Sequence, residues 1–142
     1  MFETCLAKEQ KLKELFATCT TSEAKYDAII DLGKSLSPLP EHYKTVENLV
    51  NGCQSQTYLH SFWKGDKICF NVCSDALISA GLAALLVIVY DEELPEVIFK
   101  HQPTYLEDLG ISASLSPNRA NGLYSIHLRM QQDVIKLLTE KK

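Results

Sequence analysis

The stretch from Ala76 to Tyr90 is almost wholly apolar, and it limits the possible folds more than any other part of the sequence. A helix without a polar face must be buried on nearly all sides. The stretch is shorter than the ~20 residues that a membrane-spanning helix needs, so it predicts a helix at the centre of a core. Gly81 costs this helix ~1 kcal/mol of propensity, a loss that favours the close approach of another backbone there.

Helices are predicted on both sides of this stretch. Apolar residues at helical spacing indicate a surface helix over residues 2–18. Thr20 and Glu23 fit a capping box that opens a second helix, and Gly33 is expected to end it. Further helices are expected at residues 95–99, at residues 104–110 and, capped by Ser116, from Pro117 to near the end of the chain.

Strands are predicted between the second helix and the central one. Residues 54–63 and 67–72 fit a hairpin around residues 64–66, and residues 45–50 fit a short edge strand. The period of two places Cys69 and Cys73 on one face, roughly 13 Å apart and beyond disulfide reach, so we expect them to serve packing. The fold class is therefore predicted to be α+β, with an antiparallel sheet of about three strands covered by helices around a buried central helix.

Composition bounds the organisation and the partners. The 142 residues, of which 46% are apolar, predict a single domain over residues 1–142. A net charge of −4 without a lysine and arginine cluster argues against nucleic acid as a partner, and we expect no membrane association. Five cysteines at irregular spacing, with no signal-peptide pattern at the N-terminus, favour a reducing compartment. The sequence fits a bacterial-type cytosolic protein or a mature organellar form, and of these we expect a cytoplasmic location.

The segment VNGCQSQ, residues 50–56, is where we expect the reaction chemistry to lie. Gly52 precedes Cys53 and favours a tight or mobile turn, while Gln54, Ser55 and Gln56 supply hydrogen-bonding groups. Buried structural cysteines usually lie in apolar runs, so this setting indicates a reactive thiol on a loop. We expect the loop to exchange between a tucked and an extended state, with Gly52 as one pivot.

Two later blocks accompany this segment. Asp75, in the SDA sequence of residues 74–76, precedes the central helix and is expected to cap it. The second block is SPNRANGL, residues 116–123, which contains Arg119. Together with GCQSQ, in this order and at this spacing, these blocks resemble the SufE family. Thr57-Tyr58, where a Val-Trp pair is common, and Cys73 depart from the family pattern without touching the central cysteine.

The resemblance implies a function and its partners. A SufE-like protein stimulates a SufS-like cysteine desulfurase, accepts its persulfide sulfur, here on Cys53, and passes the sulfur to an iron–sulfur scaffold complex. Pyridoxal phosphate belongs to the desulfurase, so no cofactor and no metal are expected in this chain. The resemblance also puts Arg119 among the characteristic residues, and we hypothesise that it stabilises the Cys53 thiolate or the partner interface. Kinship with the NifU and IscU fold is implied as well.

Three alternatives remain open from the residues alone. A metal or cluster scaffold of the NifU/IscU type would recruit Cys53, Cys69, Cys73 and one of His60, His101 or His127, although the spacing matches no structural zinc pattern. A cysteine hydrolase would use Cys53 with a histidine base, and an adaptor would stimulate an enzyme without carrying sulfur. A protein of this kind is expected to be a sulfur carrier rather than a stand-alone enzyme, and either a monomer or a homodimer.

Overall fold

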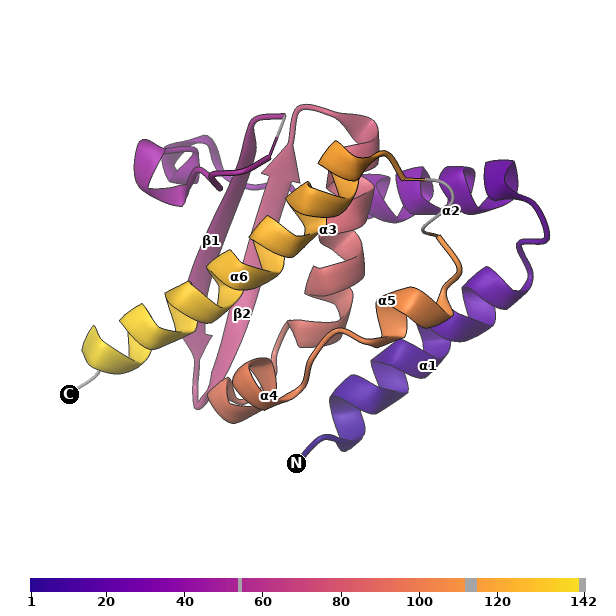
Figure 1. Cartoon of the computed structure of the whole chain (residues 1–142). Helices are drawn as coiled ribbons and strands as arrows, with labels where there is room; N and C mark the ends of the chain where they lie inside the picture. Colours follow the sequence, from indigo (N-terminus) through magenta and orange to yellow (C-terminus); the bar gives the residue numbers. More distant parts are fainter. Residues whose placement is uncertain (54, 112–114, 141–142) are drawn as a thin grey trace.

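The computed structural model describes residues 1–53, 55–111 and 115–140, and these residues form an α+β fold (Figure 1). The elements in chain order are α1 (Glu3–Ala17), α2 (Ser22–Lys34), the 3-10 turns η1 (Glu41–Tyr43) and η2 (Val46–Asn48), β1 (Thr57–Lys64), β2 (Lys67–Ser74), α3 (Leu77–Tyr90), α4 (Pro95–Lys100), α5 (Tyr105–Asp108) and α6 (Pro117–Glu140). The predicted fold class is confirmed.

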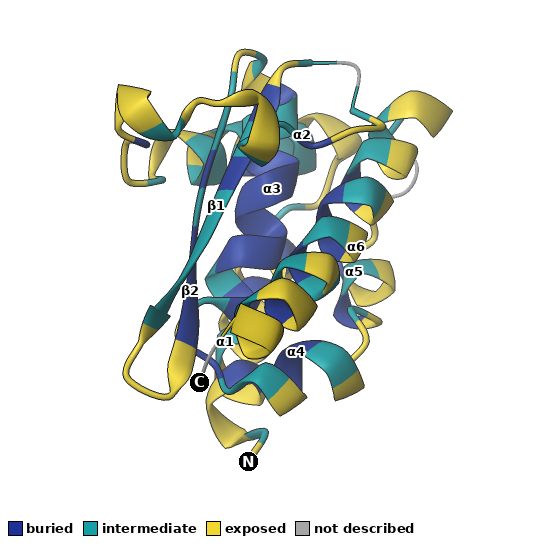
Figure 2. Ribbon diagram, turned by 90° about the vertical axis from the view of Figure 1, so that its left-hand side faces the viewer, coloured by how far each residue is buried: buried dark blue, intermediate teal, exposed yellow. Residues whose placement is uncertain are grey.

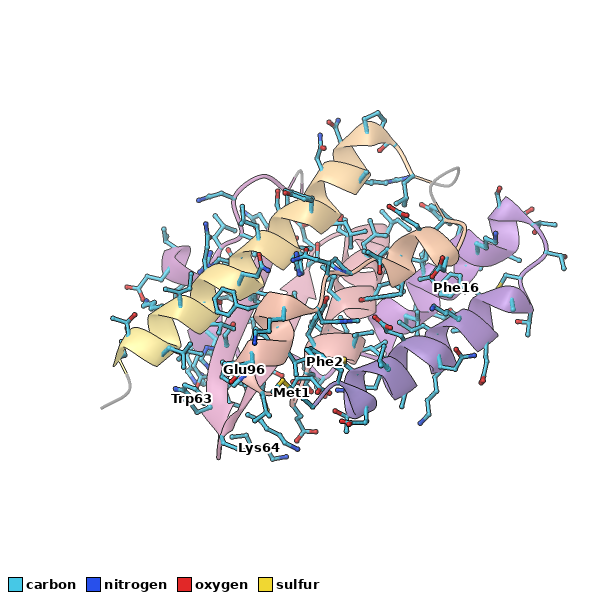
Figure 3. All side chains as sticks on the ribbon, turned by 60° about the horizontal axis from the view of Figure 1, so that its bottom comes forward. Met1, Phe2, Phe16, Trp63, Lys64 and Glu96 are labelled. Carbon is cyan, nitrogen blue, oxygen red and sulfur yellow. The ribbon has the colours of Figure 1, made fainter. Side chains whose placement is uncertain are left out.

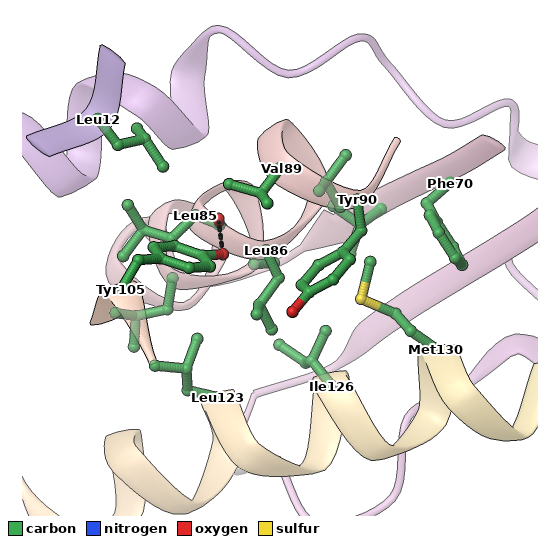
Figure 4. Close-up of a cluster of buried hydrophobic side chains, with 14 of the residues drawn as sticks. Leu12, Phe70, Leu85, Leu86, Val89, Tyr90, Tyr105, Leu123, Ile126 and Met130 are labelled. Carbon is green, nitrogen blue, oxygen red and sulfur yellow. Dashed lines mark hydrogen bonds between the residues drawn. The ribbon is translucent and has the colours of Figure 1, made fainter. Parts of the chain in front are cut away.

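Helix α3 occupies the centre of the molecule. It packs against α1, α2, α6 and β2, and Figure 2 shows that most of its surface is buried. Ile126 and Met130 of α6 point toward Tyr90 of α3 in Figure 4. No helix in the described part of the chain is both long enough and apolar enough to cross a bilayer. The predicted core helix is therefore confirmed.

Helices α2 and α3 approach each other through two glycines. A Cβ at Gly81 would lie 2.1 Å from the carbonyl oxygen of Ile29, and a Cβ at Gly33 would lie 2.6 Å from the amide nitrogen of Gly81. The close approach predicted at Gly81 is confirmed. The prediction that Gly33 ends its helix is wrong, because α2 continues through Lys34; Gly33 serves interhelical packing instead.

The start of α2 lies one residue later than the capping pattern predicted. Thr21, in an extended conformation, accepts a hydrogen bond from the amide of Ala24 at 3.0 Å, so Thr21 is the cap and Thr20 is not. Threonine is a favoured N-cap residue at either position, and Glu23 indicated Thr20 because it completes a capping box only with that residue. At α6 the expectation is confirmed, because the Ser116 hydroxyl accepts from the amide of Arg119 at 3.3 Å.

Strands β1 and β2 form the predicted hairpin, and in the described residues they make a two-stranded antiparallel sheet. The expected edge strand at residues 45–50 is wrong. That segment contains the η2 turn, and only a single bridge joins Leu49 to Tyr58. Trp63 and Lys64 lie at the hairpin tip, at the same end of the molecule as Met1 (Figure 3). The opposite end of the hairpin leads into the segment that carries Cys53.

Candidate functional site

The segment around Cys53 is a short loop closed at its base. The amide of Val50 donates to the carbonyl of Thr57 at 2.8 Å, so residues 51–56 leave and rejoin the fold at neighbouring points. Gly52 has φ of +94°, a conformation that side chains with a Cβ rarely adopt, and a Cβ there would also lie 2.5 Å from Ser125 Oγ. The predicted tight turn before Cys53 is confirmed.

The sulfur of Cys53 is half-buried at rest and faces the first turns of α6. Its thiol donates a long hydrogen bond to the carbonyl of Gly122 at 3.7 Å. It lines a pocket of about 380 Å³ together with residues from the starts of α3 and α6, among them Ser79, Leu82, Arg119 and Leu123. Because this volume is empty space beside the sulfur, the pocket has room for more than the thiol that lines it.

Burial raises the pKa of the Cys53 thiol, and a hydrogen bond with the Thr57 side chain opposes that rise. The thiolate is the nucleophilic form of cysteine, so the resting loop holds the sulfur in its less reactive state. The prediction of a reactive thiol therefore needs a second condition. The loop must move, or a partner must change the surroundings of Cys53, before the thiolate becomes abundant.

We expect the pH dependence of Cys53 alkylation to show this burial directly. Because the pKa is raised, the folded protein holds less thiolate than the urea-unfolded chain at every pH near the two midpoints. The rate of iodoacetamide reaction at Cys53 would be measured as a function of pH by peptide mass spectrometry. The midpoint of this pH profile should lie at a higher pH in the folded protein than in the unfolded chain. A folded-state midpoint at or below that of the unfolded chain would contradict the burial.

Two polar residues after Cys53 anchor the loop to the hairpin end. The Ser55 hydroxyl lies 3.0 Å from Ser74 Oγ and 3.3 Å from Thr57 Oγ1, which makes a cluster of three hydroxyl groups. The amide of Gln56 donates to the Asp75 carboxylate at 3.0 Å, and the carbonyl of Gln56 accepts from the amide of Asp75 at 3.2 Å. Gln54 lies outside the described residues.

Asp75 does not cap α3, so that prediction is wrong. The N-cap position is Ala76, and no side chain of the described residues caps the first turn there. The carboxylate of Asp75 is engaged by Gln56 instead. In a sequence, an aspartate just before a helix favours an N-cap. In the fold, the Cys53 loop places the amide of Gln56 beside this carboxylate, and the carboxylate accepts a hydrogen bond from that amide instead of from the first turn of α3.

Asp75→Ala is expected to speed the alkylation of Cys53 roughly fivefold, since an exposed hydrogen bond contributes ~1 kcal/mol to holding the loop closed. The rate would be measured with iodoacetamide at one pH, and the melting temperature should change little because Asp75 is exposed. Asp27→Ala, which removes an exposed carboxylate from α2, is the charge-matched control and should react like the wild type. An unchanged rate in Asp75→Ala would mean that this bond does not restrain Cys53.

Arg119 lines the same pocket as Cys53, but its guanidinium lies over the ring of Tyr26, 5.7 Å from the ring centre. The influences that shift the Cys53 pKa are burial and the Thr57 hydrogen bond, and a charge effect of Arg119 is not among them. The structure thus brings the two residues to one pocket without pairing them. The hypothesis that Arg119 stabilises the thiolate applies to a rearranged loop.

Arg129 is a site residue that the sequence did not reveal. Its guanidinium donates to the carbonyls of Leu49, at 2.8 Å, and of Glu47, and pairs with Asp133 at 2.8 Å. Asp133 also accepts from Ser61 of β1 at 2.6 Å. Arg129 therefore fixes the base of the Cys53 loop to α6. Its spacing of four residues from Asp133 indicated only a helical ion pair in the sequence.

The proposed metal ligands do not form a cluster. Among the described residues, no group of three histidine, cysteine or acidic side chains is arranged to hold a metal ion. The side chain of His101 pairs with Glu9, and His127 is buried against the ring of Tyr90, 5.6 Å between ring centres. All five cysteines are free thiols. The geometry does not favour the scaffold alternative.

Comparisons with known proteins agree with this fold. The family described as "SufE: Fe-S metabolism associated domain" matches residues 10–134. A solution structure of a hypothetical protein from Thermus thermophilus superposes with a TM-score of 0.76 at 26% identity, covering 94% of this chain and 97% of that one.

Three curated relatives span the same region. "Cysteine desulfuration protein SufE" of Wigglesworthia glossinidia brevipalpis is 33% identical over 129 residues, which cover 89% of this chain and 90% of that protein. "Uncharacterized SufE-like protein slr1419" of Synechocystis is 35% identical, covering 88% and 79%. "SufE-like protein 1, chloroplastic/mitochondrial" of Arabidopsis thaliana is 36% identical over 92% of this chain, which spans only 35% of that protein's length.

Proposed function

Because this chain belongs to the SufE family, we propose that Cys53 accepts persulfide sulfur from a cysteine desulfurase, stimulates that enzyme and hands the sulfur to an iron–sulfur cluster scaffold. The family places the chain in iron–sulfur metabolism and implies interaction with a cysteine desulfurase. The observation that carries the finer proposal is the half-buried thiol of Cys53, which faces a pocket from a loop turned at Gly52.

The transfer is an exchange between two sulfur atoms and needs no external oxidant. The sulfur of Cys53 attacks the terminal sulfur of the desulfurase persulfide, a new S–S bond forms, and the S–S bond within the desulfurase persulfide breaks. The thiol proton of Cys53 ends on the released desulfurase cysteine. The same exchange, repeated with Cys53 as the donor, delivers the sulfur onward.

The pocket offers a reason for the resting position of the sulfur. A persulfide is readily reduced or oxidised in solution, so shielding preserves it between the two transfers. The Cys53 sulfur already lies beside Gly122, where the absent side chain leaves space; a Cβ there would lie 3.8 Å from the sulfur. We propose that the additional sulfur atom occupies the pocket in the tucked state and leaves it when the loop extends.

Arg119 is proposed to act in the extended state. Its contact with the Tyr26 ring keeps the guanidinium at the edge of the pocket, within the region that a partner would cover. There its charge can favour the Cys53 thiolate or pair with a carboxylate of the desulfurase. A cytoplasmic location is part of the same proposal, although one relative is named chloroplastic/mitochondrial, and cell fractionation would decide it.

The proposal is tested by mass spectrometry of the wild-type protein. The chain is incubated with a cysteine desulfurase from the same genome and free cysteine, and its intact mass is compared with a sample that lacks cysteine. We expect the mass of added sulfur, and peptide mapping should locate it on Cys53. Sulfur on a different residue, or no sulfur while the desulfurase turns over, would overturn the proposal.

A further inference from the structure

Three hydroxyl side chains meet beside Cys53, where its loop rejoins the hairpin. Thr57, the first residue of β1, is fully buried and stands opposite Ser74, the last residue of β2. The Thr57 hydroxyl donates to Ser74 Oγ at 3.1 Å, and Ser55 Oγ lies within 3.3 Å of both oxygens. The start of β1, the end of β2 and the first turns of α6 lie at the same end of the molecule (Figure 1). We call Ser55, Thr57 and Ser74 the hydroxyl cluster.

The hydroxyl cluster reaches the sulfur of Cys53 from two sides. Ser55 lines the same pocket as Cys53, and the Thr57 hydroxyl is hydrogen-bonded to the Cys53 side chain. The carbonyl of Gly122, 3.7 Å from the sulfur, can only accept a hydrogen bond, so it suits a neutral thiol and repels a thiolate. A hydroxyl can also donate. Thr57 is therefore a contact that favours a negatively charged sulfur.

The hydroxyl cluster can turn a donor toward the sulfur without losing a proton. Each hydroxyl has one O–H donor and two acceptor lone pairs. Three hydroxyl groups that contact one another in a ring use all three of their protons, whereas the same groups joined as a chain use only two. When the sulfur becomes negative, opening the ring at one contact frees one O–H bond to point at it. The other two contacts within the cluster are kept.

A charged sulfur needs such a donor because apolar side chains form part of the pocket. Ile78, Leu82 and Leu123 line it, and apolar surroundings disfavour a charged group. Donors that are fixed beside a charge in a site of low dielectric stabilise it more than the same donors do in water. We propose that the hydroxyl cluster is a binding site for negatively charged sulfur, which is the thiolate of Cys53 before loading and its persulfide afterwards. Only the persulfide part rests on the proposed function.

A purely structural role for the hydroxyl cluster makes a different prediction. The cluster supplies hydrogen bonds to the buried Thr57 hydroxyl, and losing them would lower the free energy of unfolding without changing the titration of Cys53. The charged groups around the pocket are Arg119, which lies over an aromatic ring, and Asp75, which accepts from the Gln56 amide. Both charges remain when Thr57 is replaced. A shift in the titration of Cys53 would therefore report the lost hydroxyl.

The thiolate part is tested with three threonine variants. Thr57→Val removes the hydroxyl and keeps the branched shape, and Thr57→Ser keeps the hydroxyl. Thr4→Val is the matched control, because it removes a hydrogen bond to Glu93 near the N-terminus. The pH profile of the iodoacetamide reaction at Cys53 would be measured for each variant. We expect the midpoint of Thr57→Val to move to higher pH, with about tenfold less thiolate than the wild type at a pH below both midpoints.

The other two variants should keep the midpoint of the wild type. Thr57→Ser still donates to the sulfur, and Thr4→Val alters a contact at the opposite end of the molecule. The maximal rate at high pH reports how often the loop opens and would be compared separately. An unchanged midpoint in Thr57→Val, or the same shift in Thr57→Ser or Thr4→Val, would overturn the donor site.

The persulfide part is tested on loaded protein. Wild-type and Thr57→Val chains that have gained sulfur would be separated from the desulfurase, and the loss of the added mass in dithiothreitol would be followed by mass spectrometry. We expect Thr57→Val to lose sulfur about fivefold faster, because its charged sulfur is held less firmly in the pocket. Equal rates would overturn the role for the persulfide. Failure of the wild-type chain to gain sulfur would instead overturn the proposed function, and the thiolate measurement would stand without it.

Discussion

Cys53→Ser is expected to reduce sulfur loading by the desulfurase to background, because a serine hydroxyl cannot form a persulfide. The substitution replaces one half-buried polar atom with a similar one, so the fold and the affinity for the desulfurase should be retained. The loss of sulfur loading would therefore reflect the absence of persulfide formation and not a loss of binding. It would be measured as added sulfur by intact mass and as desulfurase turnover with and without the variant.

Cys73→Ser is the matched control for this result. Cys73 is also a free, partly buried thiol, and burial raises its pKa as it does for Cys53. It differs in position, because it pairs with Tyr58 within the hairpin and does not line the pocket of Cys53. We expect normal loading in Cys73→Ser. Normal loading in Cys53→Ser, or its loss in Cys73→Ser alone, would place the acceptor elsewhere.

Gly81→Ala is expected to destabilise the protein by about 3 kcal/mol or more. Alanine at a helix interior normally stabilises by up to ~1 kcal/mol relative to glycine, so the sign itself is informative. Here the added Cβ would lie 2.1 Å from the backbone oxygen of Ile29, and backbone atoms in two packed helices cannot move aside as a side chain can. The free energy of unfolding would be measured by urea titration.

Gly122→Ala provides the comparison for that measurement. Gly122 also lies inside a helix, but its Cβ would meet the Cys53 sulfur at 3.8 Å, an ordinary contact distance. Its stability should stay equal to that of the wild type or rise by up to ~1 kcal/mol. If Gly81→Ala lost less than about 1 kcal/mol, α2 and α3 would have room to separate, and the packing derived for them would be incorrect.

The success at Gly81 and the error at Gly33 have one cause. A glycine inside the apolar helix lowers its propensity, and that loss indicated the close approach of another backbone at Gly81. Gly33 could not be recognised as the partner, since it shortly precedes the serine and proline residues of SLSPLP, residues 35–40, and a glycine in that position favours a helix end. In the structure Gly33 and Gly81 lie against each other, so both positions lack a side chain for the same reason: the backbones of α2 and α3 are in contact there.

The local structure around Cys53 was predicted in part. The glycine turn, the central cysteine and the polar residues after it were all readable from the segment itself, because turn and hydrogen-bonding preferences act over a few residues. Asp75 and Arg129 were misread or missed, since their partners, Gln56 and the carbonyls of Glu47 and Leu49, lie far along the chain. A helix-capping preference predicted for Asp75 was overruled by a contact that forms only after the hairpin closes.

Local composition and periodicity were sufficient to identify the segment that carries the thiol and the helix that forms the core, because both properties are written in neighbouring residues. The state of that thiol, in contrast, depends on how distant segments pack. Cys53 packs against the core beside the starts of α3 and α6, and this burial raises the pKa of its thiol. The buried fraction of the Cys53 side chain depends on contacts with residues that are far apart in the chain, and a local sequence pattern does not contain those contacts.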